Sequence, residues 1–114
     1  MFKRGNIYLA KLYPSKGHKV CKTRPVLVLQ TNLLNDIGHT TCIILPLTTS
    51  LVENSFPLRL RVQLRDKLLK TSEILCDQIR TIDNTRLQSE VITSLSQQEL
   101  LEIEQRVQII LDFA

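Results

Sequence analysis

Six polar side chains are the candidates for chemistry in this sequence, because each lies at the end of an expected strand, where a rigid sheet can aim it. They comprise an imidazole, two guanidinium groups, a hydroxyl, a carboxylate and an amide, in the residues His18, Arg24, Thr48, Asp77, Gln78 and Arg80. Groups of these types exchange protons, or hold an anion by charge and hydrogen bonds. The sequence contains no GxxxxGK(S/T) loop, GxSxG turn, HExxH motif or EF-hand pattern, so it does not indicate those chemistries.

Three of the candidates also have a plainer interpretation. A single histidine in a loop, such as His18, is usually a surface residue. Arg24 can be one more surface cation, and Thr48, which follows Pro46 and Leu47, can be an ordinary turn residue. Residue type and position leave both interpretations of these three open.

Asp77 is harder to dismiss, because it directly follows the apolar run Ile74–Cys76. A carboxylate at the end of a buried segment costs free energy unless it is paired or hydrogen-bonded, and such groups often serve a site. Arg80 is the obvious partner, so a structural ion pair is the alternative to a catalytic role.

Basic residues are concentrated at the amino-terminal end. Residues 1–24 contain seven basic and no acidic residues, whereas the other ninety contain eight basic and eleven acidic ones. The seven are Lys3, Arg4, Lys11, Lys16, Lys19, Lys22 and Arg24. This asymmetry is typical of a protein that binds a polyanion, because Lys and Arg neutralise phosphates and release counterions. A solvated surface explains it equally well.

Length and composition predict one folded domain over residues 1–114, because 43% of the residues are apolar and can form a packed core. No run approaches the ~20 apolar residues of a membrane span, and residues 1–5 lack a signal-peptide core, so we expect a cytoplasmic protein without membrane contact. Cys21, Cys42 and Cys76 are odd in number and lack metal-ligand spacing. We therefore expect free thiols.

The segments that must position the candidate residues are expected to be short strands followed by one helix. Alternation and residue type predict strands at residues 6–12, 25–30, 41–47, 58–64, 72–82 (one strand or two abutting ones) and 91–93. In the fourth segment the alternation places Leu58, Leu60, Val62 and Leu64 inward and Arg59, Arg61 and Gln63 outward. The connections 17–23, 31–40 and 48–57 are expected to be loops, the first of them basic.

Prolines and a capping box mark the expected ends of these elements. Pro25 is predicted to begin its strand and to bias Arg24 toward extended backbone, and Pro46 to end the next strand. Ser96 and Glu99 have the spacing of a capping box. The helix that follows has an apolar stripe of Leu100, Ile103, Val107, Ile110 and Leu111. Together these elements predict an α+β fold, a small bent β-barrel packed by a carboxyl-terminal helix.

Five blocks of the sequence, in order, resemble those of a known family. They are Arg4-Gly5-Asn6-Ile7-Tyr8, Pro14-Ser15-Lys16-Gly17, Thr23-Arg24-Pro25-Val26-Leu27-Val28, Leu45-Pro46-Leu47-Thr48 and Cys76-Asp77-Gln78-Ile79-Arg80-Thr81-Ile82-Asp83. They are similar to the blocks RGxIY, P(T/S)xG, xRPVLV, (V/I)PxT(S/T) and (C/L)(D/E)Q(I/V)R(T/S)(I/V)D of the MazF/PemK/Kid toxins. The resemblance runs from Arg4 to about Leu111, and five blocks in register with almost no gap are a specific signal.

The resemblance implies an SH3-like plasmid-toxin barrel that forms a homodimer, with a cognate antitoxin occupying the RNA site and DNA contacted only through the antitoxin complex. It implies a sequence-specific endoribonuclease toxin that acts on single-stranded RNA, including mRNA. In the reaction that the resemblance implies, the substrate's 2′-OH attacks the adjacent phosphate and leaves 2′,3′-cyclic phosphate and 5′-OH ends, with no metal ion or cofactor. Such chemistry needs a base, an acid and groups that stabilise the phosphorane.

The resemblance also assigns roles to individual residues. Arg24 would stabilise the phosphorane, Thr48 would hydrogen-bond the scissile phosphate, Asp77 would be a base or acid, and His18 a proton carrier or phosphate contact. Further RNA contacts are expected from the same loops and strand ends, at Lys16, Lys19, Lys22, Thr49, Ser50, Gln78 and Arg80.

Two positions depart from the family pattern. Lys19 stands where many relatives have a glutamate, and Leu75 stands where Kid-like toxins have an arginine before the CDQ triplet. The missing glutamate keeps open a non-catalytic barrel that binds nucleic acid. A gyrase poison of the CcdB type, which shares the fold, is the other alternative. The RP arginine and the PxT and DQxR blocks favour the nuclease.

Overall fold

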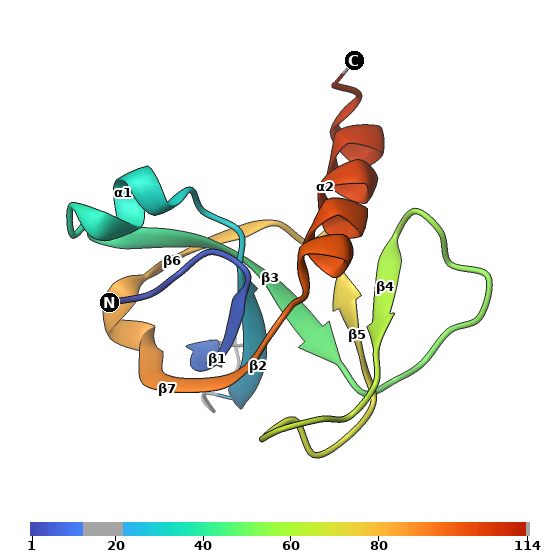
Figure 1. The fold of residues 1–114 in the computed structure, drawn as a ribbon, viewed down its shortest axis with the longest axis horizontal. Coiled ribbons are helices and arrows are strands. Elements are labelled where there is room, and N and C mark those ends of the chain that lie inside the picture. Colours follow the sequence, from blue (N-terminus) through green and yellow to red (C-terminus); the bar gives the residue numbers. More distant parts are fainter. Residues whose placement is uncertain (13–21, 114) are drawn as a thin grey trace, which may run out of the picture.

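The computed structural model describes residues 1–12 and 22–113, and the elements below are those of this part of the chain. The strands are β1 (Asn6–Leu12), β2 (Lys22–Val28), β3 (Thr41–Thr48), β4 (Arg59–Val62), β5 (Ser72–Leu75), β6 (Arg80–Asp83) and β7 (Leu87–Ser94). The helices are α1 (Asn32–Asp36), α2 (Gln97–Leu111) and the 3-10 helix Asn84–Arg86 (Figure 1). Neither α1 nor α2 is long and apolar enough to cross a membrane.

The strands form one antiparallel sheet in the order β4-β5-β3-β2-β1-β7, with β6 paired to β3. One edge of β3 is shared, because β6 pairs with Thr41–Ile44 and β5 pairs with Leu47 and Thr48. The described strands do not close into a ring, since β4 and β7 are the two ends of the order. The predicted α+β architecture, a bent barrel-like sheet with a carboxyl-terminal helix, is confirmed.

The bent sheet buries a separate apolar cluster on each face. Alternation along β1 places Tyr8, Ala10 and Leu12 in one cluster with residues of β2, β3 and β6. Ile7, which precedes Tyr8 and points to the other face, belongs to the second cluster, which α2 covers through Ile103. Alternation along a strand therefore determines which of the two clusters each side chain near the site faces.

Helix α2 begins as its sequence predicts. The Ser96 side chain accepts a hydrogen bond from the Glu99 N–H at 3.1 Å, and Glu99 Oε1 accepts one from the Ser96 N–H at 2.8 Å. Ile103 is fully buried, whereas Leu111, predicted to be part of the same apolar stripe, is 43% exposed. The last turns of α2 extend beyond the sheet (Figure 1), which explains the exposure of Leu111.

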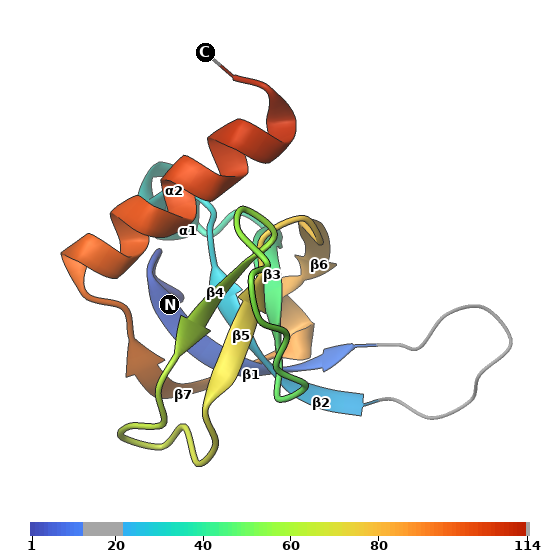
Figure 2. The same cartoon turned by 90° about the vertical axis from the view of Figure 1, so that its right-hand side faces the viewer.

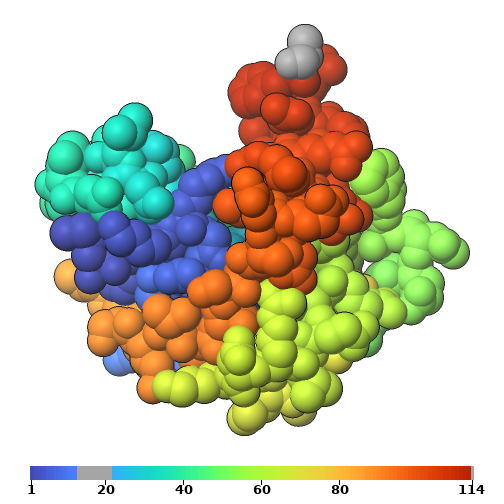
Figure 3. Space-filling model, in the orientation of Figure 1, coloured from blue at the N-terminus to red at the C-terminus, as the bar shows by residue number. Residues whose placement is uncertain are grey.

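A notch separates α2 from α1 on the surface (Figure 3). Arg4 lies in a hollow of about 320 Å³ beside α2, where it donates to the Leu29 carbonyl and pairs with Glu104 at 2.5 Å. The amino-terminal segment therefore contacts α2 through the ion pair of Arg4 with Glu104 as well as through the shared apolar cluster of Ile7 and Ile103.

The prediction that residues 31–40 are irregular was wrong. Thr31 caps α1 by accepting a hydrogen bond from the Leu33 N–H, and Asn35 is buried against Gln30 through an amide-to-amide hydrogen bond of 3.0 Å. The helix spans only residues 32–36. A helix this short is held by such capping and side-chain contacts and leaves no periodic pattern in the sequence.

Pro25 and Pro46 lie inside strands, contrary to the prediction that one begins a strand and the other ends one. β2 already begins at Lys22, so that Pro25 lies opposite Leu9 of β1, and Pro46 lies opposite Val26 within β3. Pairing of β2 with β3 starts only at Val26, so the outer side of β2 at Pro25 has no partner strand. A proline is tolerated at such an unpaired edge, because no ladder hydrogen bond is lost there.

The strand predicted at residues 58–64 is the shorter β4 (Arg59–Val62), and two of the four residues predicted to face inward are exposed. Leu60 and Val62 are buried as predicted, whereas Leu58 is 46% and Leu64 60% exposed, because they lie beyond the ends of β4. The segment predicted at residues 72–82 as one strand or two forms two, β5 and β6, separated by a turn. The last strand, β7, is longer than the predicted residues 91–93.

Candidate active site

The strand register brings Arg24 and Thr48 to the same face of the sheet. Val26 of β2 pairs with Pro46 of β3, and Arg24 and Thr48 each lie two residues beyond that pair in the same direction. Side chains two residues apart share a face, so both leave the sheet on one side, at the place where the pairing of β3 with β2 ends and its pairing with β5 begins. Arg24 is half-buried within β2, whereas the predicted strand began only after it, at Pro25.

The segment after Thr48 has no regular structure and carries two further predicted contacts. Thr48 Oγ1 accepts a hydrogen bond from the Ser50 N–H at 3.1 Å, which turns the chain sharply after β3. Ser50 and Thr49 are exposed, so their hydroxyl groups are accessible to a ligand. Arg59 donates to the Ser50 carbonyl at 2.8 Å and ties this turn to β4.

Asp77 and Gln78 lie in the turn between β5 and β6, and Arg80 begins β6 opposite Ile44. All three are exposed. The expectation that Asp77 ends a buried run and needs a partner was wrong, because burial stops at Cys76. Within residues 1–12 and 22–113, no ion pair joins Asp77 to Arg80. Both side chains are therefore available to solvent.

The described ends of β1 and β2 project together to one side of the molecule (Figure 2), and Lys22, one of the remaining predicted contacts, lies there. Lys22 is the exposed first residue of β2 and not part of a loop. His18, Lys16 and Lys19 lie outside the described residues, as does Cys21.

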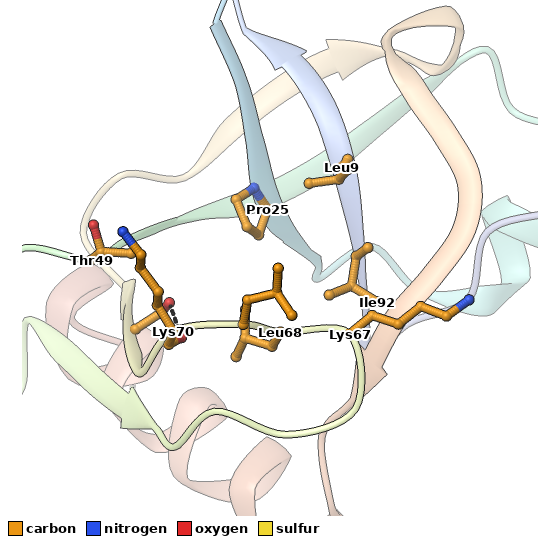
Figure 4. A pocket seen from close by; sticks show the side chains of 9 residues that line it. Leu9, Pro25, Thr49, Lys67, Leu68, Lys70 and Ile92 are labelled. Carbon is orange, nitrogen blue, oxygen red and sulfur yellow. Dashed lines mark hydrogen bonds between the residues drawn. The ribbon is translucent and has the colours of Figure 1, made fainter.

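An apolar pocket of about 290 Å³ lies on the other face of the strand ends (Figure 4). Leu9 and Pro25, which are paired across β1 and β2, line it, whereas Arg24 points to the opposite face by alternation. Its other lining residues come from the segment before β5, from β5 and β7, and from the turn after β3: Lys67, Leu68, Leu69, Lys70, Ser72, Ile92 and Thr49. Thr49 thus connects the end of β3 to this pocket.

Sequence reasoning missed a buried charge on β5. Glu73, the cross-strand partner of Thr48, is only 2% exposed. Its Oε1 accepts from Arg59 at 2.9 Å and from the Val52 N–H at 3.0 Å, and its Oε2 accepts from Arg61 at 2.8 Å. Desolvation opposes ionisation of Glu73, but these hydrogen bonds outweigh it and hold the pKa of the carboxyl below its usual value.

The sequence did contain a signal for this cluster. Glu73 is the one charged residue in the stretch from Ser72 to Cys76, all of which is buried. Arg59 and Arg61, predicted to point outward into solvent, lie opposite β5 and are half-buried against Glu73. An acid inside a buried strand, facing two arginines of a neighbouring strand, identifies such a cluster.

Neither buried cysteine is suited to nucleophilic chemistry. Cys42 and Cys76 are free thiols, and burial raises the pKa of each to about 11. A thiol with so high a pKa is protonated at neutral pH, and the thiolate is the reactive form. In the part of the chain that the structure describes, no three His, Cys, Asp or Glu residues are grouped to hold a metal ion.

Comparison with known proteins gives concordant matches in sequence and in structure. Residues 3–111 match the model of the PemK-like, MazF-like toxins of type II toxin–antitoxin systems. The endoribonuclease MazF of Staphylococcus epidermidis is 35% identical over 113 residues, covering 96% of this chain and 90% of that protein.

Two solved structures share the fold over nearly their whole length. Mycobacterium tuberculosis toxin MazF-mt6 superposes with a TM-score of 0.79 at 22% identity, over 96% of this chain and 98% of that one. A mycobacterial endoribonuclease in complex with its cognate antitoxin superposes with a TM-score of 0.78 at 18% identity, over 100% and 98% of the two chains. With a family model that spans almost the entire sequence and a relative above 30% identity, the chain belongs to the PemK-like, MazF-like toxins of type II toxin–antitoxin systems.

Proposed function

We propose that this toxin is an endoribonuclease that cleaves single-stranded RNA, including mRNA, at specific sequences and without a metal ion. Its membership of the toxin family and its 35% identity to a protein named an endoribonuclease support the activity. The observation that carries the site is the β2–β3 register, which directs Arg24 and Thr48 to one face beside an exposed turn. A cation and a hydroxyl on one face are suited to hold a phosphate.

The cleavage we propose is an internal transesterification. The 2′-oxygen of the substrate bonds to the adjacent phosphorus as its proton passes to a base. The bond from phosphorus to the 5′-oxygen breaks as that oxygen receives a proton from an acid, leaving 2′,3′-cyclic phosphate and 5′-OH ends. Arg24 would neutralise the charge on the phosphorane and Thr48 would hydrogen-bond a phosphate oxygen. Asp77 and His18 would transfer the protons, in either order.

The RNA chain would be held by the groups that surround these four residues. Among the residues that the structure describes, the exposed Lys22, Arg80, Gln78, Thr49 and Ser50 would make these contacts, and Lys16 and Lys19 complete the predicted set. With no Trp, two Tyr and three Phe in the chain, we expect bases to be selected mainly by hydrogen bonds and less by stacking.

We further propose that the toxin acts in the cytoplasm as a homodimer, with bases bound in grooves at the subunit interface, and that a cognate antitoxin covers the RNA site. The mycobacterial endoribonuclease of the same fold was solved with its cognate antitoxin, which supports an antitoxin partner here. Contact with DNA would occur only through the toxin–antitoxin complex.

The test is to incubate the purified protein with a long in vitro transcript, with and without EDTA, and to map the ends produced. We expect cuts at a recurring short sequence, unchanged by EDTA, with 5′-OH ends that polynucleotide kinase labels without prior phosphatase treatment. Arg24→Ala protein purified in the same way controls for contaminating ribonucleases. Binding of the transcript without cleavage would support the non-catalytic alternative, and 3′-OH products or strict dependence on a divalent ion would exclude this mechanism.

A further inference from the structure

We propose that Glu73 is a positioning residue for RNA cleavage: its buried carboxylate holds the turn Thr48–Val52 in the conformation that presents Thr48 to the substrate. The inference rests on the proposed function, because it assigns a role within that site. Glu73 does not touch the substrate in this proposal. It acts through the turn that carries Thr48.

The first observation is where Glu73 lies relative to Thr48. The two residues are direct cross-strand partners in β5 and β3, so their side chains share a face of the sheet. The neighbouring pair, Leu47 and Ile74, belongs to the apolar cluster under α2 on the opposite face. Glu73 is thus buried outside that cluster, beneath the segment that follows Thr48.

The second observation is that the hydrogen bonds of Glu73 reach the turn by two routes. Glu73 Oε1 accepts directly from the Val52 N–H at 3.0 Å. The same oxygen accepts from Nη1 of Arg59, which also donates to the Ser50 carbonyl at 2.8 Å. The turn is therefore attached to the carboxylate at two backbone groups, one on each side of Leu51.

The third observation is that Arg61 extends the same attachment along the chain. Its Nη2 donates to Glu73 Oε2 at 2.8 Å and to Glu53 Oε1, also at 2.8 Å. Glu53 itself is exposed, so this outer pair adds little on its own, whereas Glu73 is 2% exposed and shielded from water. The buried carboxylate is the common acceptor that holds both arginines in place.

These contacts matter because residues 49–58 contain no helix or strand. Without the Glu73 carboxylate, Arg59 and Arg61 lose their shared acceptor and the Val52 N–H loses its partner. The turn would then sample several conformations. A displacement of about 1 Å in a group that contacts the reacting atoms lowers a rate by on the order of 10²-fold.

The test compares Glu73→Gln with a matched control, Glu99→Gln. Both replace an arginine-paired glutamate by its neutral isostere. Glu99, however, pairs with Arg65 at the start of α2, and among the described residues it makes no hydrogen bond or ion pair with residues 48–53. Cleavage would be measured on an RNA oligonucleotide that spans a mapped cut site, well below the melting temperature of either variant. Arg59→Met, which removes the link to Ser50 and keeps Glu73, serves if Glu73→Gln does not fold.

We expect Glu73→Gln to lower kcat by about 10- to 100-fold, with a smaller change in KM, and Glu99→Gln to leave both within about twofold. Amide exchange followed by NMR supplies a second readout. Exchange at Val52 should accelerate in Glu73→Gln and stay unchanged in Glu99→Gln, whose effect should be confined to the first turn of α2.

The possible failures are distinguishable. A Glu73→Gln protein that cleaves like the unaltered chain, or whose Val52 amide stays protected, would overturn the positioning role and leave the proposed function intact. Equal losses of kcat in Glu73→Gln and Glu99→Gln would overturn it too, because they would indicate a general effect of stability. If the unaltered chain does not cut RNA at all, the proposed function fails and this inference fails with it.

Discussion

Replacing Ile103 by alanine tests whether α2 is held to the sheet by the face that the structure assigns. Ile103 is 0% exposed and is packed against the cluster that contains Ile7, Leu27 and Ile74. Truncation removes three buried carbon atoms, each contributing about 0.8 kcal/mol of transfer free energy, so the transfer loss is roughly 2.4 kcal/mol.

Two smaller contributions modify this value. Incomplete collapse of the cavity adds on the order of 1 kcal/mol, and the higher helix propensity of alanine returns a few tenths of a kcal/mol. The expected loss in the free energy of unfolding is therefore about 3 kcal/mol. For a chain of this size that corresponds to a fall in Tm of roughly 12 °C.

Ile109→Ala is the matched control, because Ile109 lies on the same helix and is 48% exposed. We expect its free energy of unfolding to change by less than about 0.5 kcal/mol, as is usual for an exposed position. Urea denaturation followed by circular dichroism measures both variants. Repeating it at two protein concentrations separates packing within a chain from contacts between subunits, since only the latter depend on concentration. Similar losses in the two variants, or a loss below about 1 kcal/mol for Ile103→Ala, would show that α2 packs differently.

Three further predictions concern activity, pH and assembly. Arg24→Ala should lower RNA cleavage by on the order of 10²–10³, the usual loss for one transition-state donor, with little change in Tm; near-full activity in a gel-based cleavage assay would remove Arg24 from the site. Hydrogen bonds from Arg65, opposed by desolvation, lower the pKa of Glu99 in the folded state. The contribution of Glu99 to the free energy of unfolding is therefore complete above the unfolded pKa of about 4.3, and it is lost as the pH falls through the lower folded pKa. The difference in unfolding free energy between the unaltered chain and Glu99→Gln should therefore be larger at pH 7 than at about pH 3, and an increase on acidification would contradict this sign. Light scattering should report a dimer at micromolar concentration, and a species of only 13.1 kDa would contradict the proposed homodimer.

Elements whose signals are local could be predicted from the sequence alone. β1 and the buried central part of β3 follow from runs of β-forming apolar residues, and the start of α2 follows from the spacing of Ser96 and Glu99. These signals succeed because periodicity and capping act within a few residues of chain. The blocks that resemble the family likewise indicated the fold and nominated Arg24 and Thr48 together.

Features that depend on pairing between distant segments could not be predicted in this way. Pro46 can lie inside β3 because it falls between Ile44, the last residue paired with β6, and Leu47, the first residue paired with β5. Leu58 and Leu64 are exposed because β4 ends where its pairing with β5 ends. Neither fact is encoded in local alternation, since strand length is limited by the partner.

The same distinction applies to the candidate site. Arg24, Thr48 and Asp77 could be nominated from the sequence. The register of β2 and β3 decides that Arg24 and Thr48 share one side of the sheet. The end of the buried stretch at Cys76 decides that Asp77 is exposed. Alternation predicts that Arg59 and Arg61 point into solvent, because it identifies only the face that a side chain takes and not what covers that face. That the outer face of β4 and β5 is covered by residues 50–53, with Glu73 buried beneath them, is a consequence of long-range packing that brings three separate segments together.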